Sequence, residues 1–108
     1  MSQASKRLRE ILKSPEVIVA PCAFDALSAR CVEASGFEMA ATTGFGMHGA
    51  MLGTPDNGLL AFNEMVDACG KMADAVGIPI MADAEGGYGN AINTYRTIRS
   101  FEKAGIAG

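Results

Sequence analysis

Two acidic residues, Asp83 and Glu85, come directly after an apolar segment at residues 78–82 and are followed by a glycine-rich stretch. If the extended backbone continues through them, side chains two positions apart point to the same side. Carboxylates held together away from water repel each other unless a cation joins them, and Mg²⁺ accepts carboxylates while keeping waters for a substrate. The spacing is equally compatible with one acid capping the next helix while the glycines form a turn.

Two earlier segments hold further candidate residues. Asp56 lies in the sequence Pro-Asp-Asn-Gly, which by itself favours a simple turn. The stretch from Thr43 through Gly44 and Phe45 to Gly46 could offer backbone N–H groups to an anion. No GxGxxG or GKS/T motif occurs, so neither a dinucleotide fingerprint nor a P-loop is indicated.

Alternating strands and helices would place these residues together. Apolar runs without a polar face, typical of buried parallel strands, predict strands near residues 17–20, 38–42 and 78–83. Apolar residues at helical spacing predict helices near residues 5–14, 25–35, 61–76 and 90–104. Such alternation gives an α/β fold of parallel βαβ units, in which sites lie at the carboxyl ends of the strands.

The sequence also predicts where individual elements end and which of their residues face inward. The glycines of residues 43–58 predict a loop with no regular structure, and Pro21 is expected to end the first strand. The second helix is expected to face inward with Leu27, Cys31 and Ala34. The last helix is expected to bury Ile92, Tyr95, Ile98 and Phe101.

Length and composition indicate one small domain. The chain has 108 residues, of which 49% are hydrophobic and 19% charged, as in a packed core. A (β/α)8 TIM barrel needs about 250 residues, and the final residues, Ile106-Ala107-Gly108, read as the beginning of a fourth strand. We therefore expect residues 1–108 to be a partial TIM-barrel domain, truncated before that strand.

Charge and cysteine usage exclude several classes of partner. The net charge is −3 with acids and bases interspersed, which argues against nucleic acid or an anionic membrane as partner and favours small molecules. The absence of a secretory signal or membrane span predicts a soluble, cytoplasmic protein. Cys22, Cys31 and Cys69 form no CxxC pair and are expected to be small buried apolar residues, while His48 lacks a second histidine for a metal pair.

The motifs together resemble the isocitrate lyase and phosphoenolpyruvate mutase superfamily. LGTPDNGLL, followed some twenty residues later by IPIMADAEGGYGNA, is similar to the family pattern LGxPDxG, a helix, then IPVxxDADTGYGN. PCAFDALSA, which starts at Pro21, is similar to PGxYDALSA of the decarboxylase and dimethylmalate lyase branch, and Thr43-Gly44 falls where the family has Ser-Gly. The resemblance covers nearly the whole chain in the right order.

The resemblance implies a site as well as a barrel fold. It implies Mg²⁺, or Mn²⁺, with Asp83 as the main metal carboxylate, Glu85 in the place of a second Asp and Asp56 as an outer-shell carboxylate. Thr43 and Gly44, with the adjacent Phe45, match the segment that holds the substrate's carboxylate. Two departures, Glu85 for Asp and Gly86 for Thr, affect the expected metal geometry.

The resemblance also implies the reaction class. The expected activity is Mg²⁺-dependent C–C bond cleavage in small 2-oxo or 2-hydroxy carboxylic acids through a pyruvate-like enolate, in a homotetrameric full-length protein. The family's catalytic cysteine lies on a lid loop beyond residue 108, so no catalytic residue is assigned and the chain alone is expected to be inactive. The alternatives are a phosphonomutase of the same superfamily, a truncated non-catalytic α/β fragment or a non-enzymatic binding module. Asp56, Asp83 and Glu85 are predicted to converge at the carboxyl ends of the strands and to face Thr43 and Gly44 across one cavity.

Overall fold

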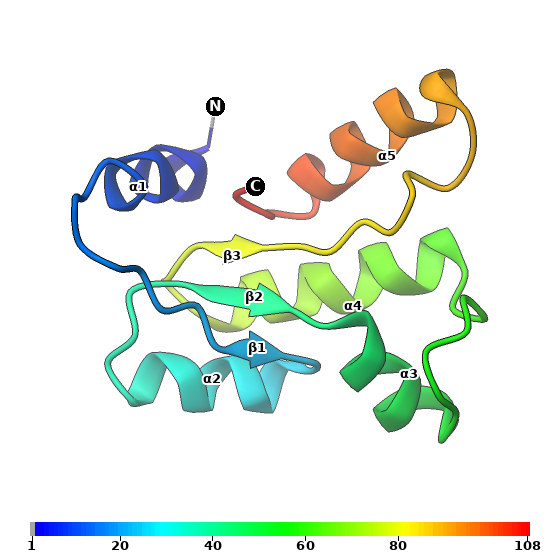
Figure 1. Ribbon diagram of the computed structural model, residues 1–108, viewed down its shortest axis with the longest axis horizontal. Coiled ribbons are helices and arrows are strands. Elements are labelled where there is room, and N and C mark those ends of the chain that lie inside the picture. The colour runs from blue at the N-terminus through cyan, green and yellow to red at the C-terminus, as the bar shows by residue number, and fades with distance from the viewer. Residues whose placement is uncertain (1) are drawn as a thin grey trace.

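In the computed structural model, which describes residues 2–108, helices pack around a three-stranded parallel sheet (Figure 1). The strands lie side by side in the order of the sequence. The elements are α1 Gln3–Ile11, β1 Cys22–Ala23, α2 Ala26–Ala34, β2 Ala40–Thr42, α3 Gly44–Leu52, α4 Phe62–Ala75, β3 Ile80–Met81 and α5 Ala91–Lys103. The α/β class with parallel strands is confirmed.

The register of the sheet brings the strand ends to one edge. Cys22 lies opposite Ala41 in the first pair, and Ala41 lies opposite Met81 in the second. Because parallel strands need a crossover between them, a helical segment each time returns the chain to the end of the sheet where the strands begin. All three strands therefore end on the same side of the molecule, where the arrowheads point in Figure 1.

Helix α4 supplies the centre of the core. Its residues Met65, Cys69 and Met72 are fully buried and belong to one apolar cluster with strand residues Ala40 and Ile80. These three positions follow the spacing i, i+4, i+7. The predicted helix over residues 61–76 is confirmed.

Residues 106–108 continue the sheet beyond β3. The Ala107 N–H donates to the Ile80 carbonyl oxygen at 2.9 Å, and the Ala82 N–H donates to the Gly108 carbonyl oxygen at 2.8 Å. These bonds use the edge of β3 that does not pair with β2. The segment read as the beginning of a fourth strand thus lies where such a strand would pair.

The first strand lies later in the chain than predicted. Residues 17–20 form no strand, and Val17 and Val19 are 92% and 59% exposed. The ladder instead begins at Pro21, whose carbonyl accepts the Ala41 N–H at 3.0 Å. A proline is tolerated at the first position of a strand, where its missing N–H costs no ladder bond. Interpreting Pro21 as the end of the strand was therefore wrong.

Helix α3 occupies residues that were predicted to be a loop. The Thr43 hydroxyl accepts the Gly46 N–H at 3.1 Å and caps the helix. Gly53, with φ of +65°, ends it in the left-handed conformation that favours glycine. Each internal glycine costs about 1 kcal/mol of helix propensity, and burial of Met47 and His48 compensates for that cost.

Helix α1 also differs at its ends from the prediction. It begins after Ser2, whose hydroxyl accepts the Ser5 N–H at 3.1 Å, and it ends at Ile11. Ser5, near which the helix was predicted to begin, lies inside it. Both serines are spaced to act as caps, and the sequence alone does not choose between them.

The inward faces predicted for α2 and α5 are largely wrong. Ala29 and Val32 are the buried residues of α2, and Thr97 and Phe101 are those of α5. Ala29, Val32 and Phe101 belong to the apolar cluster that contains the strand residues Ala40 and Ile80, so packing against the sheet decides which side of each helix is buried. The predicted inward residues that are exposed are Leu27, Cys31, Ala34, Ile92, Tyr95 and Ile98.

The cysteines do not share one environment. Cys69 is buried, whereas Cys22 and Cys31 are exposed, so the prediction of three buried cysteines holds for one. Burial raises the pKa of the Cys69 thiol to about 11, and the charge of Asp83 adds to the rise, although a hydrogen bond with Thr42 opposes it. None of the helices within residues 2–108 is long and apolar enough to span a bilayer.

This difference predicts the reactivity of the thiols. In the folded chain at pH 8, Ellman's reagent should modify Cys22 and Cys31 rapidly and Cys69 only after denaturation in urea, because thiolate is the reactive form. A Cys69→Ala variant serves as the control and should lose only the thiol that reacts after denaturation. Three thiols reacting at one rate in the folded chain would contradict this core.

Candidate functional site

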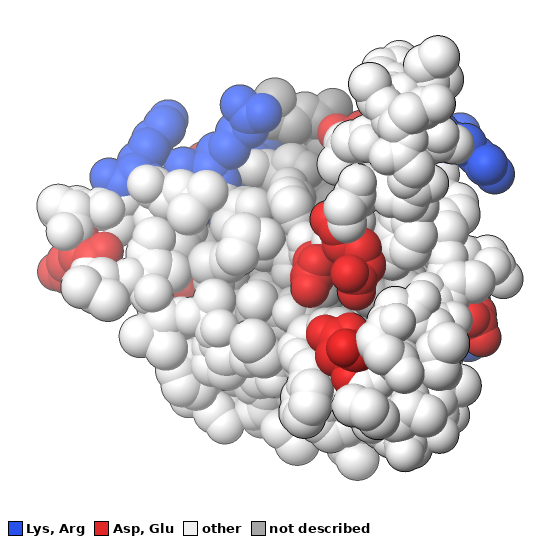
Figure 2. Space-filling view, turned by 45° about the vertical axis from the view of Figure 1, so that its right-hand side comes forward, with Lys and Arg blue, Asp and Glu red and all other residues white. Residues whose placement is uncertain are grey.

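Three carboxylates meet beside Gly44, at the edge where the strands end. A Cβ built on Gly44 would lie 3.1 Å from Glu85 Oε1, 3.5 Å from Asp83 Oδ2 and 3.6 Å from Asp56 Oδ2. Figure 2 shows acidic side chains gathered on this face. The structure therefore brings together the three acids singled out in the sequence, from two separate loops.

Asp83 and Glu85 reach the same side by a turn and not by an extended strand. Strand β3 ends at Met81, and the Asp83 N–H donates to the Thr42 hydroxyl at 2.8 Å. The Glu85 N–H donates to Asp83 Oδ1 at 2.9 Å, and Glu85 has φ of +51°. For a residue other than glycine, this left-handed backbone conformation costs on the order of 1–3 kcal/mol of folding free energy. The contacts around Glu85 must therefore hold it there.

Neither acid caps the helix that follows. The N-cap of α5 is Asn90, whose side-chain oxygen accepts the Ile92 and Asn93 N–H groups. The alternative in which Asp83 or Glu85 is a helix cap is therefore wrong. Asp83 does accept the Glu85 N–H through one oxygen, which leaves Oδ2 facing Gly44.

Asp56 lies in the loop between α3 and α4 and is oriented by contacts on two sides. Its Oδ2 faces Gly44, while its Oδ1 lies 3.4 Å from His48 Nδ1. His48 is 1% exposed, and its Nδ1 also lies 2.8 Å from the Gly44 carbonyl oxygen. No sequence pattern singled out this role of His48, because its contact with the Gly44 carbonyl oxygen exists only on helix α3, which was predicted to be a loop.

The Thr43, Gly44 and Phe45 segment forms the beginning of α3. Thr43 is the N-cap, Gly44 is buried and the Phe45 side chain is 69% exposed. The first N–H groups of a helix have no intrahelical partner and attract anions, aided by the helix dipole. The segment thus presents hydrogen-bond donors directly beside the carboxylates.

The negative charge of the acids is felt by a neighbouring buried group. Burial raises the pKa of Tyr88 to about 12, and the charge of Glu85 is the next largest cause. The Tyr88 hydroxyl is buried and has no hydrogen-bond partner within residues 2–108. Its ring packs edge-on against Phe62, with 5.4 Å between centroids.

The donor set at Gly44 fits a hydrated magnesium ion. Hard carboxylate oxygens are the ligands Mg²⁺ prefers, and it keeps several waters when few side chains bind it directly. No three His, Cys, Asp or Glu side chains of residues 2–108 are close enough to hold a metal ion as a group. The missing Cβ of Gly44 leaves space between the acids, so Asp56, Asp83 and Glu85 would hold the ion partly through water.

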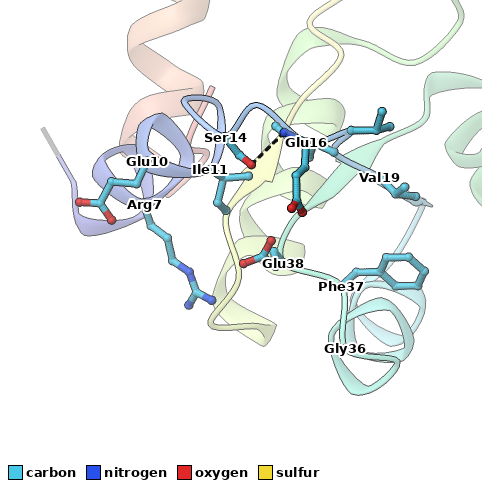
Figure 3. A pocket seen from close by; sticks show the side chains of 11 residues that line it. Arg7, Glu10, Ile11, Ser14, Glu16, Val19, Gly36, Phe37 and Glu38 are labelled. Atoms are coloured by element: carbon cyan, nitrogen blue, oxygen red, sulfur yellow. Dashed lines mark hydrogen bonds between the residues drawn. The ribbon is translucent and has the colours of Figure 1, made fainter.

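Two hollows lie on different sides of the molecule. An open pocket of about 520 Å³ adjoins the acids and is lined by residues 58–61 together with Glu85, Gly86, Tyr88 and Gly89. A groove of about 560 Å³ is lined by residues that precede β1 and β2, including Arg7, Glu16 and Glu38 (Figure 3). The groove therefore lies at the amino ends of the strands, away from the candidate site.

Comparison with known proteins gives the family of the chain. The sequence profile of the phosphoenolpyruvate phosphomutase family matches residues 8–108. The 2,3-dimethylmalate lyase of Eubacterium barkeri is 44% identical over 107 residues, which are 99% of this chain and 37% of that protein. The chain thus has an α/β architecture with a parallel sheet and belongs to the isocitrate lyase and phosphoenolpyruvate mutase superfamily.

Solved structures agree with this assignment. The phosphoenolpyruvate phosphomutase from Streptomyces platensis subsp. rosaceus has a TM-score of 0.87 and 36% identity, over 97% of this chain and 36% of that one. A phosphonopyruvate hydrolase solved with oxalate and Mg²⁺ has a TM-score of 0.90 and 30% identity, over 97% and 37%. These are members of a TIM-barrel superfamily, and the chain spans little more than a third of their length.

The space at Gly44 can be tested with one methyl group. Gly44→Ala should leave the free energy of unfolding unchanged or raise it slightly, by about 0–1 kcal/mol, because alanine favours a helix more than glycine does. The same methyl would lie 3.1 Å from Glu85 Oε1 and displace that flexible side chain. Mn²⁺ binding measured by calorimetry at 10 °C should therefore weaken by about tenfold, as when a metal ligand's support is removed.

A matched substitution on the same helix is the control. Gly49→Ala adds a methyl where nothing lies within 4 Å, so it should leave Mn²⁺ binding unchanged. Equal affinity of the Gly44→Ala and Gly49→Ala variants would show that the space beside Gly44 is not a cation site.

Proposed function

We propose that this chain provides the cation-binding and carboxylate-binding loops of a Mg²⁺-dependent lyase that cleaves a C–C bond in small 2-oxo or 2-hydroxy carboxylic acids. The observation on which this rests is the approach of three carboxylate oxygens to within 3.1–3.6 Å of one point beside Gly44. The 44% identity to a 2,3-dimethylmalate lyase favours a lyase. The oxalate and Mg²⁺ in a related hydrolase support the cofactor.

The residues of the chain divide the task between charge and orientation. Asp83 and Glu85 hold the cation, and Asp56 acts from farther out. The N–H groups of Gly44 and Phe45, at the positive end of α3, hold the substrate's carboxylate, with Thr43 capping the helix so that these donors stay in place. Bound Mg²⁺ supplies positive charge that stabilises the enolate oxygen left by C–C cleavage.

The departures from the family pattern are compatible with this role. Glu85 has one methylene more than the Asp of the pattern, yet its Oε1 approaches Gly44 more closely than either aspartate does. A Cβ on Gly86 would meet nothing within 4 Å, so the threonine of the pattern is not needed to fill space here. Both observations support retention of the cation.

A phosphonomutase is the second candidate. The matching family profile is that of phosphoenolpyruvate phosphomutase, and its Streptomyces structure superposes with a TM-score of 0.87. The two activities share an enolate-stabilising cation and differ in the bond broken, C–C or P–C. Phosphonopyruvate added as substrate, with phosphoenolpyruvate as the measured product, separates the mutase from the lyase.

The assembly of the whole protein stays a prediction. The chain spans 37% of the dimethylmalate lyase it matches. We propose that residues 1–108 are the first βα units of a longer barrel. A homotetramer and a cytoplasmic location are predictions that accompany this proposal. An in-frame sequence after codon 108, with a strand that ends in a Glu-Asp pair, would support it.

Asp83 should be essential for cation binding. Asp83→Asn keeps the acceptor for the Glu85 N–H but removes the negative charge, so Mn²⁺ binding to the chain should fall by at least about tenfold. In the longer protein, pyruvate formation from 2,3-dimethylmalate, 2-methylisocitrate or oxaloacetate should fall below detection. Asp67→Asn, which removes an exposed charge paired with Lys71, is the matched control and should change neither quantity. Undiminished turnover of Asp83→Asn would refute the assignment.

The chain alone should lack activity and be weakly stable. The outer edge of β1 pairs with no other strand of residues 2–108, and an unpaired strand edge promotes association between molecules. We expect a free energy of unfolding below the ~5–15 kcal/mol of ordinary domains, measured by urea titration at 10 °C. Cooperative unfolding of a monomer together with measurable pyruvate formation would show that these loops suffice for the reaction.

A further inference from the structure

His48 is a buried polar side chain that the proposed chemistry does not use. It lies on α3 with 1% of its surface exposed, and both ring nitrogens have contacts. Nδ1 lies 2.8 Å from the Gly44 carbonyl oxygen, and Nε2 lies 3.2 Å from the Leu60 backbone nitrogen. The ring therefore joins the first turn of α3 to the segment that leads into α4.

These contacts determine where the imidazole proton is. The Leu60 N–H donates to Nε2, so Nε2 carries no hydrogen. The proton of the neutral ring is then on Nδ1, where it donates to the Gly44 carbonyl oxygen. The tautomer of His48 is thus assigned from the hydrogen-bond partners of its two ring nitrogens.

Nδ1 of His48 also lies close to the Asp56 carboxylate. Asp56 Oδ1 lies 3.4 Å from Nδ1, and Asp56 Oδ2 is the oxygen directed at Gly44. The partial positive charge on the N–H attracts Oδ1, which leaves Oδ2 aimed at the other carboxylates. Asp56 is part of a turn and 39% exposed, so without this contact its side chain would be free to rotate towards water.

We propose that His48 is a positioning residue. Its Nδ1–H orients Asp56, while its Nε2 attaches the loop that contains Leu60 to helix α3. This inference rests on the proposed cation site. It assigns two functions to the two nitrogens, orientation of the acid to Nδ1 and attachment of the loop to Nε2. Groups that orient metal ligands from behind typically change metal affinity about 10–100-fold when removed.

Two conservative substitutions separate the nitrogens. The amide nitrogen of His48→Asn takes the place of Nδ1 and can donate to Gly44 and Asp56, but the side chain is too short to accept from Leu60. The amide oxygen of His48→Gln takes the place of Nε2 and can accept from Leu60, but no donor remains at the Nδ1 position. If His48 orients Asp56, His48→Asn should keep Mn²⁺ affinity within about threefold and His48→Gln should lose about tenfold.

A purely structural role predicts the opposite order. If the Leu60 anchor alone mattered, His48→Gln would bind Mn²⁺ like the unsubstituted chain and His48→Asn would be impaired. The free Mn²⁺ concentration is measured by electron paramagnetic resonance at 10 °C, with urea unfolding of each variant measured in parallel. Met65→Ala, which removes a buried core side chain, is the control that lowers stability without touching the site.

The outcomes distinguish this inference from the function on which it rests. If the unsubstituted chain binds no Mn²⁺, the cation site itself is refuted. If the unsubstituted chain binds Mn²⁺ and the two His48 variants have the same Mn²⁺ affinity as each other, the positioning role is refuted. It is also refuted if His48→Gln binds Mn²⁺ more tightly than His48→Asn. A nitrogen NMR spectrum of the imidazole provides a second test, which should show a protonated Nδ1 and an unprotonated Nε2. A proton on Nε2 would overturn the assignment of the two nitrogens.

Discussion

The parallel pairing of the strands is the constraint on which the site depends. Parallel neighbours require a crossover, and each crossover returns the chain to the same edge of the sheet. The loops after β2 and β3 must then leave from one edge, although 41 residues separate Thr42 from Asp83. The Asp83 N–H donates to the Thr42 hydroxyl at 2.8 Å, a bond that fixes one loop to the end of the neighbouring strand. The position of Asp83, and of Glu85 bonded to it, follows from these two features.

The absence of a side chain at Gly44 makes the second contribution. Three acids converge on a place where any other residue would put a Cβ 3.1 Å from Glu85 Oε1. The carboxylates are costly neighbours for one another, and a helix N-terminus supplies only partial positive charge. The proposed cation would neutralise this repulsion, and a related phosphonopyruvate hydrolase was solved with Mg²⁺ and oxalate.

Local patterns predicted much of the fold from the sequence. Helix α4 was predictable because its apolar positions repeat over four turns, and α2 because Asp25 is a strong cap that accepts the Ser28 N–H at 2.7 Å. Helix α3 was not predictable from propensity, since its glycines disfavour a helix and tertiary burial of Met47 overrides them. The strand near residues 17–20 was mispredicted because hydrophobicity does not fix register, which pairing with Ala41 sets.

The candidate site shows the same division. Asp83, Glu85 and Asp56 could be selected by residue type and by resemblance, but the turn that joins Glu85 to Asp83 depends on a positive φ that no spacing rule gives. Sequence reasoning did not identify the role of His48, because its contact with Gly44 requires helix α3 and its contacts with Asp56 and Leu60 require the folded loop that follows this helix. Chemistry-bearing residues are thus easier to predict than the residues that orient them.

Anomalous diffraction from crystals grown with Mn²⁺ would locate the proposed cation. We expect one anomalous peak beside Gly44, within reach of Asp83 and Glu85 directly or through water, with Asp56 farther out. Crystals of the Asp83→Asn variant, grown in the same way, should lack this peak. A peak elsewhere on the chain, with none at the ends of the strands, would refute the cation site.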